Sequence, residues 1–188
     1  MSLFNLPSPL DKTFADTDDL PVFFDRLMEG MVELLQCDLC YFYLRDPQRK
    51  EGQILHAHSV RSEIPNFKQA QKQTEDFYLS QTDPFFAAAL NCEPAIFIED
   101  LQTVGKIKDK EFCQEKYPEQ KALIQAHICM KNELWGILQA SQFSRPRSWT
   151  EFDRSLISLV SDKIAPLVSI YSQRKIRDAV QYIHDGNC

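Results

Sequence analysis

The stretch Leu134–Asp153, with the sequence LWGILQASQFSRPRSWTEFD, decides how this chain is expected to fold. Its first part, Leu134–Gln142, is largely apolar and is typical of a buried strand. A polar turn that contains Pro146 and Trp149 follows. Thr150, with an acidic residue three positions later, then has the pattern of a capping box. The stretch therefore predicts a buried strand joined to an amphipathic helix by a specific turn.

Apolar stripes near both ends of the chain predict two long helices. The first follows a cap at Asp18 or Asp19 and has Pro21 in its first turn. Its stripe is Leu20, Phe23, Phe24, Leu27, Met31, Leu34 and Leu35. The second begins at Thr150, with the stripe Phe152, Leu156, Leu159, Val160, Ile164, Leu167, Val168 and Tyr171. Because proline removes a helical hydrogen bond, a kink or break is expected near Pro166.

The middle of the chain predicts strands and short helices. The strand patterns are Leu39–Leu44, Gln53–Val60, Ala95–Ile98, Leu123–Met130 and Leu134–Gln142. Short helices are expected at Phe67–Phe77, at Phe85–Leu90 after the cap Asp83, and within Lys106–Gln120. This order indicates an α+β fold. We expect a central antiparallel sheet, with the N- and C-terminal helices packed on one face and a layer of loops and short helices on the other.

Length and charge limit the organisation and the function class. The chain divides into an N-terminal arm at 1–19, a single domain at 20–171 and a C-terminal helical extension at 172–188. A net charge of −6 argues against nucleic acid as a partner. No apolar run is long enough for membrane insertion, and the acidic start lacks a basic leader. These features predict a cytoplasmic protein.

The pairs Trp135-Gly136 and Pro146-Arg147, with Trp149 and the acidic helix start, resemble the last strand and helix of a GAF sensory domain. The resemblance is nearest to the bilin-binding GAF domains of cyanobacterial phytochrome-like photoreceptors. Those relatives carry a Cys-His pair in a middle helix and a His inside an Ala-His-Gln triplet. Here Lys110-Glu111 and Ser141 stand at those places. The resemblance therefore implies the GAF fold but disfavours covalent bilin; no cofactor is expected, and a non-covalent ligand is unidentified.

Two other GAF activities are disfavoured by the same comparison. Cyclic-nucleotide-binding GAF domains carry an Asn-Lys pair where this chain has Ser141-Gln142. Free methionine sulfoxide reductases use a Gly-Val-Cys-Gly-type loop that this sequence lacks. We therefore expect no enzymatic activity and no catalytic residue.

Polar residues inside the two final strands are the candidate ligand-binding residues. They interrupt apolar strands, so they face either solvent or a ligand cavity. The candidates are Gln125, His127, Gln139 and Ser141, with Arg147 in the following turn. Arg147, like Arg145 in the same turn, could bind an anionic ligand or form a salt bridge to Glu151 or Asp153, and the salt bridge is the default.

Histidines and cysteines supply weaker alternatives. His56 and His58 share a face of their strand and could bind a metal, but no further ligand is placed by sequence, so polar positions on a half-exposed face are favoured. Cys37 and Cys40 have the spacing of a redox pair, and Cys113 could join them in a thiol or iron–sulfur sensor. Packing is the simpler interpretation of these cysteines.

The sequence thus supports two function hypotheses of different class. The first is a noncatalytic sensory or regulatory domain that binds a small molecule or a protein. Its signal would pass through the packing of the terminal helices, which form a homodimer. The second is a degenerate GAF fold that acts as a structural or assembly protein on a larger protein partner.

Overall fold

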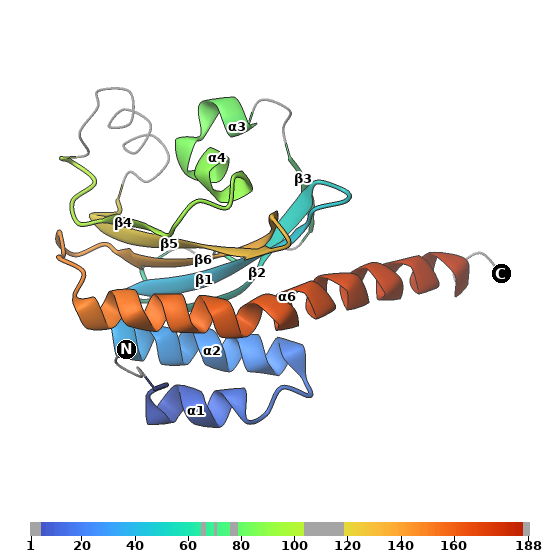
Figure 1. Cartoon of the computed structure of the whole chain (residues 1–188), viewed down its shortest axis with the longest axis horizontal. Helices are drawn as coiled ribbons and strands as arrows, with labels where there is room; N and C mark the ends of the chain where they lie inside the picture. The colour runs from blue at the N-terminus through green and yellow to red at the C-terminus, as the bar shows by residue number, and fades with distance from the viewer. Residues whose placement is uncertain (1–4, 65–66, 70, 76–78, 104–118, 186–188) are drawn as a thin grey trace.

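A six-stranded antiparallel sheet is the centre of the molecule in the computed structural model (Figure 1). The structure describes residues 5–64, 67–69, 71–75, 79–103 and 119–185. The strand order is β3-β2-β1-β6-β5-β4. The strands are β1 Leu39–Asp46, β2 Glu51–Ser59, β3 Gln73–Thr74, β4 Ile96–Ile98, β5 Ala122–Met130 and β6 Glu133–Gln142. The predicted α+β fold is confirmed.

The hairpin between β5 and β6 fixes the register of the two longest neighbouring strands. Lys131 and Asn132 form its turn, and both have left-handed backbone angles, with φ of 53° and 61°. A two-residue turn with positive φ at both positions matches the right-handed twist of the flanking strands. The register pairs Gln125 with Gln139 and His127 with Ile137.

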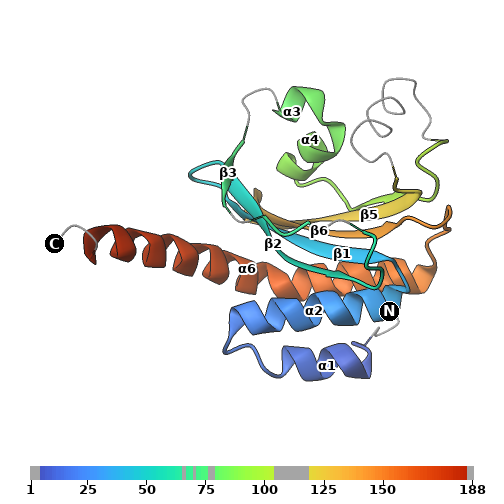
Figure 2. The same cartoon turned by 180° about the vertical axis from the view of Figure 1, so that it is seen from behind.

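Two long helices cover one face of the sheet (Figure 2). Helix α2 spans Leu20–Leu35, and its cap Asp19 accepts a hydrogen bond from the Val22 amide, as the sequence predicts. Helix α6 spans Glu151–Asp185. At its start, the Asp153 amide donates to the Thr150 hydroxyl and the Thr150 amide donates back to Asp153. The capping box predicted at this position is therefore present.

Helix α1, Ser8–Phe14, lies on the outer side of α2 and adds a third layer to this half of the molecule. The sequence predicts only an arm here. Leu10 of α1 is fully buried and packs over Gly30 of α2, where an added Cβ would meet Leu10 at 2.8 Å. Phe14 contacts Phe23 edge-on, with ring centroids 5.2 Å apart. The arm thus contributes to the core because a glycine lets it approach closely.

Helix α6 continues through Pro166 without a break. Of the kink or break expected near Pro166, the break does not occur; in Figures 1 and 2 the helix changes direction along its length, and its second half extends beyond the sheet. The buried stripe begins at Leu156, because Phe152 is exposed at the first turn. Within the described residues, no helix is both long and apolar enough to cross a membrane.

The opposite face carries short helices, α3 at Leu79–Thr82 and α4 at Pro84–Leu90. Asp83 caps α4 by accepting from the Phe85 and Phe86 amides, as predicted. The helix expected at Phe67–Phe77 is not formed in the described part of that segment, because Gln73 and Thr74 pair with β2 instead. The helix expected within Lys106–Gln120 falls almost entirely outside the described residues.

Candidate functional site

Four of the predicted ligand-binding residues lie on the α4 side of the sheet. Alternation along the strands turns Gln125 and His127 of β5, and Gln139 and Ser141 of β6, away from the long helices. Gln125 and Gln139 are direct cross-strand partners, and Gln139 also faces Tyr41 of β1. We refer to Gln125, His127, Gln139 and Ser141 as the polar cluster.

Three of the four residues of the polar cluster are buried, His127 is half-buried, and one acceptor of the cluster is unsatisfied. Gln139 is 1% exposed and Ser141 is fully buried. The Gln139 amide nitrogen donates to the Ser141 hydroxyl at 3.2 Å and to the Gln120 side chain at 3.5 Å. Its Oε1 atom has no hydrogen-bond partner among the described residues. Since an unmet buried acceptor is costly, Gln139 Oε1 is a point where a ligand donor would gain binding energy.

Helix α4 and the turn after it are hydrogen-bonded to the same cluster. The Gln125 amide nitrogen donates to the Phe85 carbonyl at 3.0 Å. His127 Nδ1 lies 2.8 Å from the Glu93 carbonyl. Because a carbonyl can only accept, Nδ1 carries the proton and Nε2 accepts from Gln125 at 3.3 Å. Burial lowers the pKa of His127, which favours this neutral form.

Aromatic rings border the polar cluster. Tyr41 stacks on Phe67, with ring centroids 5.7 Å apart, and Tyr43 meets Phe86 edge-on at 6.5 Å. Burial raises the pKa of both tyrosines, which keeps their phenols neutral. The arrangement offers neutral hydrogen-bonding groups between aromatic walls, a chemistry suited to a planar polar ligand.

Charged side chains on this face include the buried Asp83 at the start of α4, whose charge adds to the effect of burial in raising the pKa of Tyr41, and an ion pair at the β3 edge. The guanidinium of Arg45 pairs with Glu75, and both side chains are buried. Arg45 also donates to the Leu134 carbonyl at 3.1 Å. Because the two charges neutralise each other, the pair closes the β3 end of the face without leaving a net charge there.

Arg147 does not join the polar cluster. Its guanidinium donates to the Gln36 carbonyl at the end of α2 and pairs with Asp153 at 3.2 Å. It also lies over the Trp149 ring, 4.6 Å from the centroid. The salt bridge that the sequence favours is confirmed, and the arginine serves to join the β6–α6 turn to α2.

The proposed thiol site is not assembled in the described residues. Cys37 and Cys40 are buried among the residues that pack under the long helices. Burial raises the pKa of Cys37 to about 12 and that of Cys40 well above its usual value, so both remain unreactive thiols. Cys113 lies outside the described residues.

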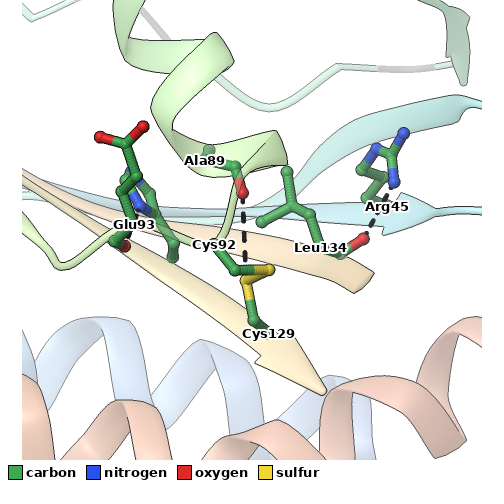
Figure 3. Close-up of a disulfide and its surroundings, with 7 residues drawn as sticks. Arg45, Ala89, Cys92, Glu93, Cys129 and Leu134 are labelled. Carbon is green, nitrogen blue, oxygen red and sulfur yellow. Dashed lines mark hydrogen bonds between the residues drawn. A yellow bond between two sulfur atoms is a disulfide. The ribbon is translucent and has the colours of Figure 1, made fainter. Parts of the chain in front are cut away.

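Sequence reasoning missed a different pair, the disulfide between Cys92 and Cys129 (Figure 3). Their separation of 37 residues gives no local signal. The strand register supplies the only usable clue, since Cys129 shares the α4 side of β5 with Gln125 and His127.

His56 lies on the other face and is not the half-exposed residue that was expected. Its Nδ1 contacts Asp25 of α2 at 3.0 Å and its Nε2 contacts the Tyr171 hydroxyl of α6 at 3.1 Å. Burial outweighs the effect of Asp25 and lowers the pKa of His56. The described residues hold no group of three or more His, Cys, Asp or Glu that could bind a metal.

The fold is similar to solved structures of photoreceptor GAF domains. The PixJ GAF domain of Thermosynechococcus elongatus, in its blue-light-absorbing form, is 18% identical, with a TM-score of 0.60 over 98% of this chain and all of that one. GAF3 of Slr1393 from Synechocystis sp. PCC6803, in its photoproduct state, is 21% identical, with a TM-score of 0.62 over 87% of this chain and 99% of that one. The chromophore-binding domain of the bacteriophytochrome RpBphP3 from R. palustris is 14% identical, with a TM-score of 0.64 over 91% of this chain and 64% of that one.

At these identities the solved structures show a shared fold. No curated protein gives a significant match. A model of the GAF domain family matches residues 19–167, which are most of the chain and include α2, the whole sheet and the first half of α6. The chain belongs to the GAF domain family.

Proposed function

We propose that this protein is a noncatalytic sensory domain that binds a small molecule over the polar cluster. The observation that carries the proposal is the row of the half-buried Tyr41 and the buried Gln139 and Gln125, in which Gln139 Oε1 lacks a partner among the described residues. Interior polar groups without partners reduce stability. Ligand binding explains why this face retains such polar groups better than packing does.

The expected ligand is planar, largely uncharged and held without a covalent bond. Neutral amide, imidazole, hydroxyl and phenol groups would bind its polar edge, and the rings of Tyr41 and Phe67 would contact its faces. The similarity to photoreceptor GAF domains makes linear tetrapyrroles the first probes. Lys110-Glu111 stands where those relatives carry the Cys-His pair, whose cysteine forms the covalent bond, so non-covalent binding is the expected mode.

A conformational change on ligand binding would be transmitted through α6. Arg147 connects the turn after β6 to α2 and to the first turn of α6, so a shift of β6 would reach both helices. Farther along α6, the Ser172 hydroxyl donates to the Arg45 carbonyl on β1 at 3.0 Å. We infer that a cytoplasmic homodimer formed by the terminal helices reports this shift.

A second candidate function is a structural or assembly role, in which a protein partner is bound on the helix side. The supporting observation is a pocket of about 250 Å³ between the start of α2 and α6. Asp18 and Asp19 supply acidic groups to its lining, and Arg174 and Lys175 supply basic ones. Such mixed charge suits a polar segment of another protein.

Native mass spectrometry of the full chain, with absorption spectra after coexpression with a bilin-synthesis pathway, tests the two candidates. The sensory proposal expects an added small-molecule mass that is lost on denaturation. A chain that is free of small molecules and copurifies at fixed stoichiometry with one protein would favour the assembly role.

A pair of serine variants locates the ligand. Ser141→Val replaces a buried hydroxyl in the polar cluster, whereas Ser169→Ala removes a buried hydroxyl on α6 that bonds only locally to the Pro166 carbonyl. The ligand mass should fall in the first variant and persist in the second. Equal ligand occupancy in both would move the binding site away from the polar cluster.

A further inference from the structure

A disulfide joins the end of α4 to β5 directly beside the polar cluster. Cys92 follows α4, Cys129 lies on β5, and their Cα atoms are 6.0 Å apart. Figure 3 shows the two sulfur atoms between the last turn of α4 and the strand below it. The bond therefore ties a short helix to the sheet at the edge of the candidate binding face.

This pair differs from the other described cysteines in its surroundings. Cys37 and Cys40 are buried, whereas Cys92 and Cys129 are only half-buried. Asn91, Glu93 and Pro94, which flank Cys92, are exposed. A protein thiol can reach the sulfur of Cys92 through this turn, and it has no such route to the buried thiols.

The disulfide also holds a hydrogen bond of the site in place. Glu93, next to Cys92, presents its carbonyl to His127 Nδ1 at 2.8 Å. Cys92 itself has a left-handed backbone, with φ of 53°, a conformation that non-glycine residues adopt reluctantly. Once the bond is cut, this turn is held by its backbone hydrogen bonds to α4 and by the contact to His127, so it gains freedom relative to the strand.

In the reduced state, the thiol of Cys129 would have a hydrogen-bond acceptor nearby. Cys129 Sγ lies 3.9 Å from the Ala89 carbonyl in the last turn of α4 (Figure 3). The disulfide has no proton to donate there, but a Cys129 thiol would. The surroundings of the bond therefore accommodate both oxidation states.

We propose that Cys92–Cys129 is a reversible thiol–disulfide exchange site, reduced by a protein dithiol, and that it sets how firmly the end of α4 is held. One thiolate of the dithiol attacks Cys92 Sγ, breaks the Cys92–Cys129 bond and releases the Cys129 thiolate. The second thiolate of the dithiol attacks the mixed disulfide and releases the Cys92 thiolate. Two electrons pass to this chain, its two new thiols take up the two protons of the dithiol, and the dithiol becomes a disulfide.

The inference concerns the attachment of α4 and stands whether or not the polar cluster binds a ligand. Its test uses the full chain equilibrated in buffers of graded reduced-to-oxidised glutathione ratio, followed by alkylation and peptide mapping. Cys92 and Cys129 should become alkylated together, reversibly, at an intermediate ratio. Alkylation of both in fully oxidising buffer, or protection of both under excess reductant, would overturn the proposal.

Hydrogen exchange on the same samples tests the structural consequence. On reduction, amide exchange at Asn91–Glu93 should rise about ten-fold, with α2 unchanged. Cys129→Ser and Cys92→Ser should each exchange like the reduced wild type in every buffer. Cys37→Ala, which changes a buried cysteine away from the turn, should keep the response. Identical exchange of the oxidised and reduced wild type would contradict the assigned role.

Discussion

The two faces of this sheet are built from alternate residues of the same strands, yet their contents differ. On the helix side, Phe42, Leu138 and Ala140 join a continuous apolar cluster with α2 and α6. On the α4 side, the buried neighbours Gln139 and Ser141 belong to the polar cluster, which lies between two small apolar groups. One face therefore contributes most of the hydrophobic stability, while the other retains polar groups that packing alone does not favour.

The difference separates the residues that hold the fold together from those that line the proposed binding face. Aromatic stacking of Phe24 on Phe42 and Tyr171 lies entirely on the helix side. Substitutions on the α4 side leave that stack untouched. We expect stability and binding to respond to different residues, even when those residues are adjacent in sequence.

The largest expected effect is at Leu138, on the helix side of β6. Leu138→Ala should lower the free energy of unfolding by about 2–5 kcal/mol, because the side chain is fully buried. Urea denaturation measures the change, and Leu138→Met, which conserves volume, is the matched control with a cost below about 1.5 kcal/mol. Equal stability of the alanine variant and the wild type would refute the assignment of this face as the main core.

A smaller loss is expected at Asp38, which joins the ends of the two central strands. Its Oδ2 atom accepts from the Gln142 side chain at 3.0 Å and from the Phe143 and Ser144 amides at 2.7 and 3.1 Å. Asp38→Ala leaves these donors unmet and should cost about 1–3 kcal/mol in thermal or urea unfolding. Asp38→Asn, which keeps an acceptor, should recover part of the loss; no difference between the variants would argue against this role.

A pH dependence should separate the buried His56 on the helix side from the half-buried His127 on the α4 side. Burial lowers the folded-state pKa of both His56 and His127 below the usual 6.5. The unfolded chain then binds more protons, so their contribution is present above pH 6.5 and is lost as the pH falls through the folded pKa.

Urea unfolding measured from pH 8 to pH 5 tests whether the free energy of unfolding falls on acidification. His56→Gln should reduce the loss of stability on acidification by about 1.4 kcal/mol for each unit of pKa shift that it removes. The contribution of His127 should remain. Asp25, Lys68 and Tyr171 surround His56, and the lowered pKa of Asp25 acts only in more acidic solution. A wild type that gains stability on acidification from pH 7 to pH 5 would reverse our assignment of neutral histidines.

The smallest effect on stability is expected at Gln139. Gln139→Leu removes an acceptor that has no partner among the described residues together with the donor to Ser141 and Gln120; because these effects oppose each other, the free energy of unfolding should change by less than about 1 kcal/mol in either direction. Gln53→Leu, at a half-buried glutamine of β2, is the matched control. A loss as large as that of Leu138→Ala would mean that Gln139 is a structural residue.

Much of this architecture follows from local patterns in the sequence. The capping box at Thr150 and Asp153, the caps Asp19 and Asp83, and the five predicted strands are set by nearby residues, so sequence reasoning finds them. The grouping of Gln125, His127 and Gln139 on one side also follows from strand alternation. The salt-bridge alternative for Arg147 can likewise be predicted from the sequence.

The remaining features depend on contacts between distant segments. Helix α1 is stabilised by the space over Gly30, and His56 is buried only because α2 and α6 meet above β2. The pairing of Cys92 with Cys129 requires the register of α4 against β5. Pro166 is tolerated inside α6, a result that propensity alone does not predict.

Native mass spectrometry of three proteins expressed in the same cells tests most directly whether the two faces divide stability from binding. The proteins are the wild type, Leu138→Val and Gln139→Leu. We predict that the small-molecule mass is present in the wild type and in the less stable Leu138→Val, and is absent from the stable Gln139→Leu. Retention of the ligand by Gln139→Leu, or no ligand in any of the three, would contradict the account.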